Sequence, residues 1–242
     1  MREDHRKIAK FYDNQYYGNI TSETSPSRHL RGLSEILRIS ADDRVLDIAC
    51  GTGEWLAVCA EKGASVSGID ISSKAIGICQ QRLPAGEFLC QPAETLPYPD
   101  NSFDIITCLG SLEHFLDQNK SISEISRVAK PDARILILVP NAGFMTYRLG
   151  LYSGTQQKAA RETIRSLEEW KAMLENNGLA IQSRWKDLHV IKFSWIFRKP
   201  YLLVPLRAIQ AIALLIWPLE WQYQVYHECA VDKQTPQNKR TR

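Results

Sequence analysis

The chain has 242 residues, of which 44% are hydrophobic and 24% charged, and this ordinary globular usage excludes a wholly disordered or collagen-like protein. The net charge is +3, and the tail 232–242 alone carries four Lys and Arg residues against one Asp, so the remaining body is neutral. No basic face is implied, and nucleic acid is not an expected partner. The polar basic tail, 232–242, is expected to be disordered.

The cysteines and the N-terminal segment indicate the cellular compartment in which the protein is expected to work. Six cysteines stand singly, without a C-x-x-C pair, and most fall within apolar runs. Buried thiols in a reducing compartment explain them better than disulfides or zinc, so no metal is expected. The N-terminal segment is charged and lacks the apolar core of a secretory signal. The sequence therefore predicts a cytoplasmic protein.

The first forty residues predict two cap helices. Apolar and aromatic residues recur at near-helical spacing over 5–17, and a second amphipathic pattern covers about 29–39. Beyond residue 40 the pattern changes, and short apolar runs alternate with helical stretches. The expected strands are 44–49, 65–70, 87–91, 103–109 and 134–140, and the expected helices are 54–62, 73–83 and 120–128.

The C-terminal half continues this alternation. Ser166 and Glu169 form a capping box that opens a helix, which Gly178 closes, and 180–185 and 224–231 predict two further strands. Near-continuous apolar strands separated by helices indicate a parallel sheet covered on both faces. We therefore expect one α/β domain over 41–231, with a Rossmann-like, seven-stranded, mainly parallel sheet and the segments 1–40 and 190–222 as additions to it.

The strongest motif is the run Val45-Leu46-Asp47-Ile48-Ala49-Cys50-Gly51-Thr52-Gly53. It is an apolar strand that enters a glycine turn and then a helix, where the backbone can approach a ligand closely. The next apolar strand ends in Asp70, and an acid at that position can accept the hydroxyl hydrogens of a ribose. The pattern indicates a nucleoside site.

Two residues argue against a dinucleotide at this site. A G-x-G-x-x-G pattern would require glycine at position 56, where Leu56 stands. Asp47 lies just before the turn, where a carboxylate would repel phosphate and attract a cation. A phosphate-free nucleoside that carries an ammonium and a sulfonium fits better. A nicotinamide-dependent oxidoreductase remains the alternative enzyme, and a catalytically silent partner-binding or membrane-binding protein is the alternative outside enzymes.

At this point the chain resembles a known family. The glycine loop, Asp70, the Gln91-Pro92-Ala93-Glu94 block, residues 96–104 and the Ser111–Phe115 block follow in the order seen in class I S-adenosylmethionine-dependent methyltransferases, particularly those with a type-11 methyltransferase domain. The resemblance covers about residues 30–140. It implies methyl transfer from S-adenosylmethionine to a small-molecule acceptor, on a sheet whose last strand is antiparallel.

The resemblance also implies roles for individual residues. Asp47, Ala49, Gly51 and Gly53 would line the methionine end of the cofactor, Asp70 would hold the ribose, and Leu109 would lie beneath the methionine portion. Ile71, Ala93 and Glu94 would meet the adenine, while Tyr12, Tyr17 and Arg28 of the N-terminal helices would close over the cofactor.

His114 is the candidate catalytic residue. It follows the fourth strand, where the methyl acceptor usually approaches, and a histidine can take a proton from a hydroxyl or amine at neutral pH. The alternative is that Glu113 and His114 only brace the loop beneath the cofactor.

The apolar segment 201–221 has three interpretations. Its length nearly matches the ~20 residues of a membrane span, but Arg207, Gln210 and two prolines interrupt it. We favour a hydrophobic helix that packs over the acceptor pocket, formed with 1–40 and 141–165. A helix that lies on a membrane or lipid surface is the second interpretation, and a span is the third. The neighbouring aromatic residues favour an apolar or amphipathic acceptor.

Overall fold

The computed structural model describes residues 3–18, 26–148, 150, 162–188, 196–197 and 199–232. The predicted disordered tail falls outside these residues from position 233 onward.

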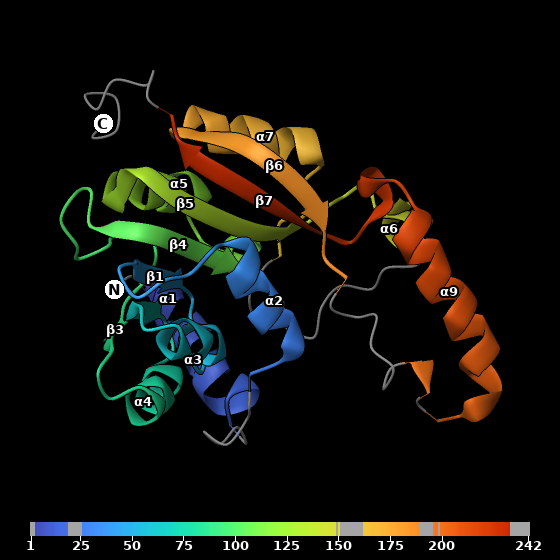
Figure 1. The fold of residues 1–242 in the computed structure, drawn as a ribbon, viewed down its shortest axis with the longest axis horizontal. Coiled ribbons are helices and arrows are strands. Elements are labelled where there is room, and N and C mark those ends of the chain that lie inside the picture. The colour runs from blue at the N-terminus through green and yellow to red at the C-terminus, as the bar shows by residue number, and fades with distance from the viewer. Residues whose placement is uncertain are drawn as a thin grey trace.

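Seven strands form one sheet in the order β3-β2-β1-β4-β5-β7-β6 (Figure 1). The first five strands are parallel, β7 is antiparallel to β5, and β6 is antiparallel to β7. This confirms the seven-stranded, mainly parallel α/β prediction, including the antiparallel last strand. The strands are β1 (Arg44–Ile48), β2 (Ser65–Asp70), β3 (Glu87–Cys90), β4 (Phe103–Leu109), β5 (Ala129–Pro140), β6 (Leu179–Lys186) and β7 (Gln224–Val231).

The boundaries match the apolar runs, with one notable exception. Strand β5 begins at Ala129 and not at Arg134, because Ala129 already pairs with Phe103 before an irregularity in the ladder between residues 103 and 105. The ion pair between Lys130 and Asp104 holds this added part of β5 beside β4. Polar residues at the start of β5 hid this extension from the hydrophobic pattern.

Helices cover both faces of the sheet, and side chains that alternate along the strands feed two cores. One core joins Leu46, Ile106 and Ile135 to the helices α5 and α7. The other joins Val45, Ile105 and the helices α2, α3 and α4. The helices are α2 (Arg28–Ile36), α3 (Glu54–Glu61), α4 (Ser73–Arg82), α5 (Gln118–Val128) and α7 (Leu167–Asn176).

Local signals set the helix ends. The side chain of Ser72 accepts a hydrogen bond from the Ala75 N–H and caps α4, and Ser166 and Glu169 form the predicted capping box of α7. The N-terminal helix α1 (Glu3–Phe11) continues into a π-helical turn, η1 (Tyr12–Tyr16), which packs against α4.

A long excursion separates β6 from β7. Lys186 pairs with Val225, so the chain leaves and rejoins the same end of an antiparallel pair. The described part of this excursion contains the short 3-10 turns η3 (Tyr201–Leu203) and η4 (Leu219–Trp221) around helix α9 (Val204–Ile216). In Figure 1, α9 projects beyond the body of the sheet. Among the described residues, no helix is long and apolar enough to cross a membrane.

Candidate cofactor and acceptor site

A cavity of about 460 Å³ lies at the carboxyl ends of β1, β2 and β4. This is the edge where ligands bind in open parallel sheets, because the connections after neighbouring strands diverge there. Its wall combines the glycine loop after β1, the end of β2, the residues after β3, the connection after β4, and the N-terminal elements α1 and η1.

The glycine loop adopts a backbone that few residues tolerate. Ala49, Gly51 and Gly53 have φ angles of 59°, 53° and 74°. A Cβ atom at Gly51 would lie 3.0 Å from the Tyr17 hydroxyl, and one at Gly53 would lie 2.9 Å from the Cys79 sulfur. Gly53 caps α3 from a buried position, so it shapes the loop without lining the cavity.

Asp70 joins the end of β2 to this loop. Its Oδ2 accepts a hydrogen bond from the Gly51 N–H at 2.9 Å, and its Oδ1 accepts one from the Ser72 N–H at 2.8 Å. Burial raises the pKa of Asp70 to about 6, although both backbone hydrogen bonds favour the charged form. Each carboxylate oxygen has a further lone pair, so Asp70 can still accept the two hydroxyl hydrogens of a ribose.

Asp47 is the second buried acid of the cavity wall. Thr107 donates a hydrogen bond to its Oδ1 at 2.6 Å, and burial raises the pKa of Asp47 to about 7. The described residues that line the cavity include four acids, Asp47, Glu54, Asp70 and Glu94, and among them there is no Lys or Arg. The cavity therefore favours a cation over a phosphate-bearing ligand.

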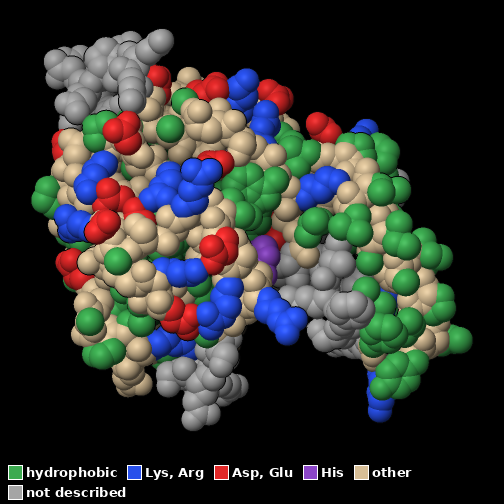
Figure 2. Space-filling view, in the orientation of Figure 1, with side chains coloured by type: hydrophobic (Ala, Val, Ile, Leu, Met, Phe, Trp, Pro, Cys, Tyr) green, Lys and Arg blue, Asp and Glu red, His purple; other side chains and the backbone are tan. Residues whose placement is uncertain are grey.

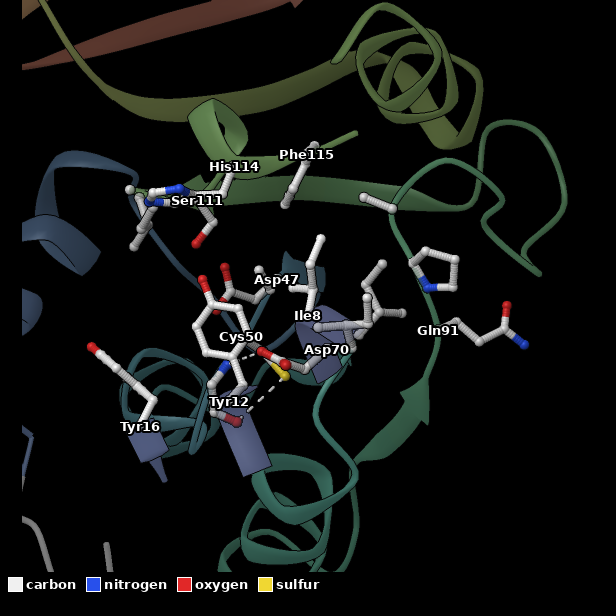
Figure 3. A pocket seen from close by; sticks show the side chains of 18 of the residues that line it. Ile8, Tyr12, Tyr16, Asp47, Cys50, Asp70, Gln91, Ser111, His114 and Phe115 are labelled. Carbon is white, nitrogen blue, oxygen red and sulfur yellow. Dashed lines mark hydrogen bonds between the residues drawn. The ribbon is translucent and has the colours of Figure 1, made fainter. Parts of the chain in front are cut away.

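The N-terminal elements close one side of the cavity. His5, Ile8, Tyr12, Tyr16 and Tyr17 all line it. Figure 3 shows Tyr12 beside Asp47 and Asp70, Tyr16 on the other side of Tyr12, and Ser111, His114 and Phe115 on the wall across from Asp70. Burial raises the pKa of both Tyr12 and Tyr17, so both phenols are neutral near pH 7. Tyr17 lines the cavity, and its contact with the cofactor stays a prediction.

Specific hydrogen bonds hold these elements in place. His5 Nε2 lies 3.3 Å from Glu94 Oε1. Asp13 accepts hydrogen bonds from the hydroxyls of Ser72 and Ser73 and from the Lys74 N–H. No local sequence signal marks His5 or Asp13 as site residues. The amphipathic pattern over 5–17 indicated a buried face, but it contained no sign of which partners that face would meet.

The connection after β4 forms the opposite wall. Leu109, Ser111, His114 and Phe115 line the cavity, and Glu113 Oε1 lies 4.0 Å from His114 Nε2. Burial raises the pKa of Glu113 to about 8. The Glu113 carboxyl is therefore mostly neutral near pH 7.

The structure gathers most of the predicted site residues around one cavity and leaves two outside it. The lining residues include Asp47, Ala49, Gly51, Asp70, Ile71, Ala93, Glu94, Leu109, Tyr12, Tyr17 and His114. Gly53 stands behind the loop, and Arg28 is exposed at the start of α2. Among the described residues of 141–165 and 190–222, none lines the cavity, so their part in an acceptor pocket stays a prediction; of the segment 1–40, residues from 3–18 and Leu30 line it.

Comparison with known proteins agrees with this geometry. The sequence profile of a methyltransferase domain matches residues 46–137. The chain is 32% identical over 169 residues to the uncharacterized methyltransferase YcgJ of Bacillus subtilis, covering 65% of this chain and 66% of that protein. It is 33% identical over 134 residues to a demethylmenaquinone methyltransferase of Thermotoga maritima, covering 54% and 58%.

A third relative is matched over more of its length. The chain is 31% identical over 194 residues to the 27-O-demethylrifamycin SV methyltransferase of Amycolatopsis mediterranei, covering 73% of this chain and 68% of the relative. The chain thus spans about three fifths to two thirds of these proteins. A crystal structure of a SAM dependent methyltransferase from Aquifex aeolicus shares the fold, with a TM-score of 0.57 at 16% identity, and covers 95% of this chain and 100% of that one.

The strand order, the glycine loop and the acid at the end of β2 define the class I methyltransferase fold. With the matches above, the chain belongs to the S-adenosylmethionine-dependent methyltransferase family.

Proposed function

We propose that the protein transfers the methyl group of S-adenosylmethionine to a small apolar or amphipathic acceptor. The observation that carries this proposal is the acidic cavity at the carboxyl edge of the sheet, which joins Asp47 and Asp70 to an aromatic N-terminal wall. A dinucleotide would bring two phosphates to this wall, where the lining from the described part of the chain provides no Lys or Arg to meet them.

The residues present suit the cofactor at each of its parts. Asp47, Ala49 and the Gly51 N–H region would meet the methionine end, where the buried Asp47 carboxylate suits an ammonium group. Asp70 would accept from the ribose hydroxyls. Ile71, Ala93 and Glu94 would meet the adenine. When bound, the cofactor supplies an electrophilic methyl group on a sulfonium.

The protein's own contribution is then alignment. Because the sulfonium needs no further activation, holding the acceptor in line with the methyl group can lower the barrier by several kcal/mol, on the order of 7–11 at best. The cavity wall also has apolar and aromatic surface, which comes from Ile8, Tyr12, Tyr16, Phe115 and Leu116. This surface supports an acceptor that is at least partly apolar.

His114 is the residue positioned to act as a base on an acceptor hydroxyl or amine. It lines the cavity on the wall that follows β4. A base is required only when the acceptor arrives protonated, so the need for His114 depends on the acceptor. The names of the relatives that act on demethylmenaquinone and on a demethylrifamycin support a small-molecule acceptor.

Calorimetry with S-adenosylmethionine and with NAD tests the cofactor assignment, and methyl transfer from labelled cofactor to fractionated metabolite extracts tests the activity. We expect binding of the sulfonium compound and a labelled product that partitions into organic solvent. Preferential binding of NAD would overturn the assignment. Tight cofactor binding without transfer to any fraction would favour the catalytically silent protein.

A further inference from the structure

Helix α9 and the turns beside it present an unusually apolar surface, here called the apolar arm (Tyr201–Trp221). Leu206, Ile209, Ile212 and Ile216 are 61%, 65%, 59% and 77% exposed, and Leu202 in η3 is 89% exposed. Figure 2 shows hydrophobic side chains gathered over α9, whereas charged side chains are spread over the body. Within α9 only Ala211 is buried.

The arm is held in a definite position. Lys186 Nζ donates to the Leu215 carbonyl at 2.8 Å, and Gln222 Nε2 donates to the Leu214 carbonyl at 2.9 Å. The last residue of β6 and a residue just before β7 therefore both contact the end of α9. Asn141, directly after β5, donates its Nδ2–H to the Glu220 carbonyl at 2.7 Å. These bonds attach the arm to the carboxyl edge of the sheet, the edge that holds the cavity.

The charge of the segment between Asp187 and Glu220 indicates which kind of surface the apolar arm would bind. Between Asp187 and Glu220 the sequence contains no Asp or Glu, but it contains Lys192, Arg198, Lys199 and Arg207. Basic residues beside an apolar helix attract it to anionic lipid headgroups. Tyr201, Trp217 and Trp221 of the arm are the aromatic types that concentrate where headgroups meet acyl chains.

The dimensions of α9 favour a surface position over the alternatives. A helix of 13 residues is about 20 Å long, against ~30 Å for a hydrocarbon core. A helix too short to span the bilayer can still lie in its surface, with its apolar face toward the acyl chains. A second copy would also bring two basic stretches together.

We propose that the apolar arm lies on an anionic membrane surface, with Leu202, Leu206, Ile209, Ile212 and Ile216 in the headgroup–acyl boundary. Resting on the proposed function, this places the cavity edge of the sheet toward acceptors dissolved in the bilayer. The substrate class is then a membrane-resident apolar molecule, which would reach the cavity without crossing bulk water.

Vesicle co-sedimentation tests the docking surface. We expect the protein to bind vesicles of phosphatidylcholine with phosphatidylglycerol, to bind pure phosphatidylcholine much less, and to lose binding as salt is raised. The double variant Ile209→Glu/Ile212→Glu should lose at least about tenfold in vesicle affinity, because two exposed apolar side chains that the membrane would bury become charged. The control Ile36→Glu changes a residue of similar exposure on α2 and should bind as the wild type.

Equal vesicle binding by the double variant and the wild type would overturn the proposal, as would absence of binding to the anionic vesicles. A lipid-free dimer that the double variant abolishes would assign the surface to a second copy instead. Should the double variant not fold, quenching of wild-type fluorescence by brominated phosphatidylglycerol, reduced in Trp217→Phe, gives the same answer; no quenching would overturn the proposal. None of these readings requires the cofactor, so loss of S-adenosylmethionine binding would count only against the proposed function.

Discussion

Two buried carboxylates give the cavity its chemical preference. Asp47 and Asp70 lie in its wall, and burial raises the pKa of each, to about 7 and about 6. A carboxylate held in a poorly solvated position destabilises the empty protein but attracts a cationic ligand strongly. The same burial that makes these residues costly to fold therefore makes the site selective.

Asp70 should be the residue whose loss most directly weakens cofactor binding. We expect Asp70→Ala to weaken the binding of S-adenosylmethionine by about 1–3 kcal/mol, because the ribose hydroxyls lose a charged acceptor. The change also frees the Gly51 and Ser72 N–H groups, so the melting temperature should fall as well. Calorimetric titration measures the affinity, and an unchanged affinity would contradict the assignment.

Asp47→Asn should stabilise the empty protein in a pH-dependent way. Because burial raises the pKa of Asp47 from 3.8 to about 7, the folded protein binds more protons than the unfolded chain between these values. The contribution of Asp47 to the free energy of unfolding is therefore fully present below about pH 4 and is lost as the pH rises through about 7. Asparagine does not ionise, so the variant avoids this fall in the free energy of unfolding, and its side-chain oxygen can still accept the hydrogen bond from Thr107.

Thermal unfolding of wild type and Asp47→Asn from pH 5 to pH 8 measures this effect. The variant's advantage in melting temperature should grow with pH, while its affinity for S-adenosylmethionine should fall. Asp42→Asn, at an exposed position two residues before β1, is the matched control and should show neither change. A pH-independent difference would mean that Asp47 is not the group that titrates.

His114 should act on turnover and not on cofactor affinity. If it takes a proton from the acceptor, His114→Ala and the similarly sized His114→Gln should both slow turnover by about 100-fold or more, with cofactor affinity near normal. The pH profile of turnover should also lose its lower limb. Unchanged turnover would show that His114 only braces the loop after β4.

At the scale of elements, the N-terminal cap depends on one carboxylate. Asp13, in η1, accepts hydrogen bonds from Ser72, Ser73 and the Lys74 N–H at the start of α4. Its negative charge also lies beside the N-terminus of that helix, where it is favoured by the helix dipole. Asp13 thus links η1, with its tyrosines, to Ser72, whose backbone N–H donates to Asp70.

Releasing that contact should loosen the cap. We expect Asp13→Ala to lower stability by roughly 1–2 kcal/mol, through lost hydrogen bonds at the start of α4, and to speed cofactor dissociation. Stopped-flow displacement measures the dissociation rate, and hydrogen exchange of α1 amides reports on the cap. Asp4→Asn, an exposed acid on α1, is the control. A dissociation rate equal to that of the wild type would mean that η1 does not retain the cofactor.

The sequence allowed the strands and the glycine loop to be predicted, because their signals are local. Apolar runs such as 65–70, the capping box at Ser166 and the glycines at 51 and 53 each carry their physical reason within a few residues. The partners of Asp13 and His5 lie 59 to 61 and 89 residues away along the chain, and no local pattern encodes such pairings. Likewise, periodicity identified an apolar segment at 201–221 but not the side of the molecule on which it would lie.

At the scale of the whole molecule, the cavity and the apolar arm share one edge of the sheet. The carboxyl ends of β1, β2 and β4 hold the cavity, and β5 and β6 end at the same edge, where the arm leaves the sheet. The parallel arrangement alone places the loops after these strands together. A chain can therefore add a docking element at β6 without altering the strands that bind the cofactor.

This separation predicts the outcome of removing the arm. Because Lys186 and Val225 are already paired neighbours, a variant that joins Asp187 to Leu219 through a short Gly-Ser linker should keep the β6–β7 pairing. We expect it to bind S-adenosylmethionine within about twofold of the wild type, since no described residue of 199–221 lines the cavity. Its binding to anionic vesicles should be lost, together with transfer to bilayer-dissolved acceptors. Comparable loss of transfer to the same acceptor presented in detergent would instead assign the arm a direct part in the acceptor pocket.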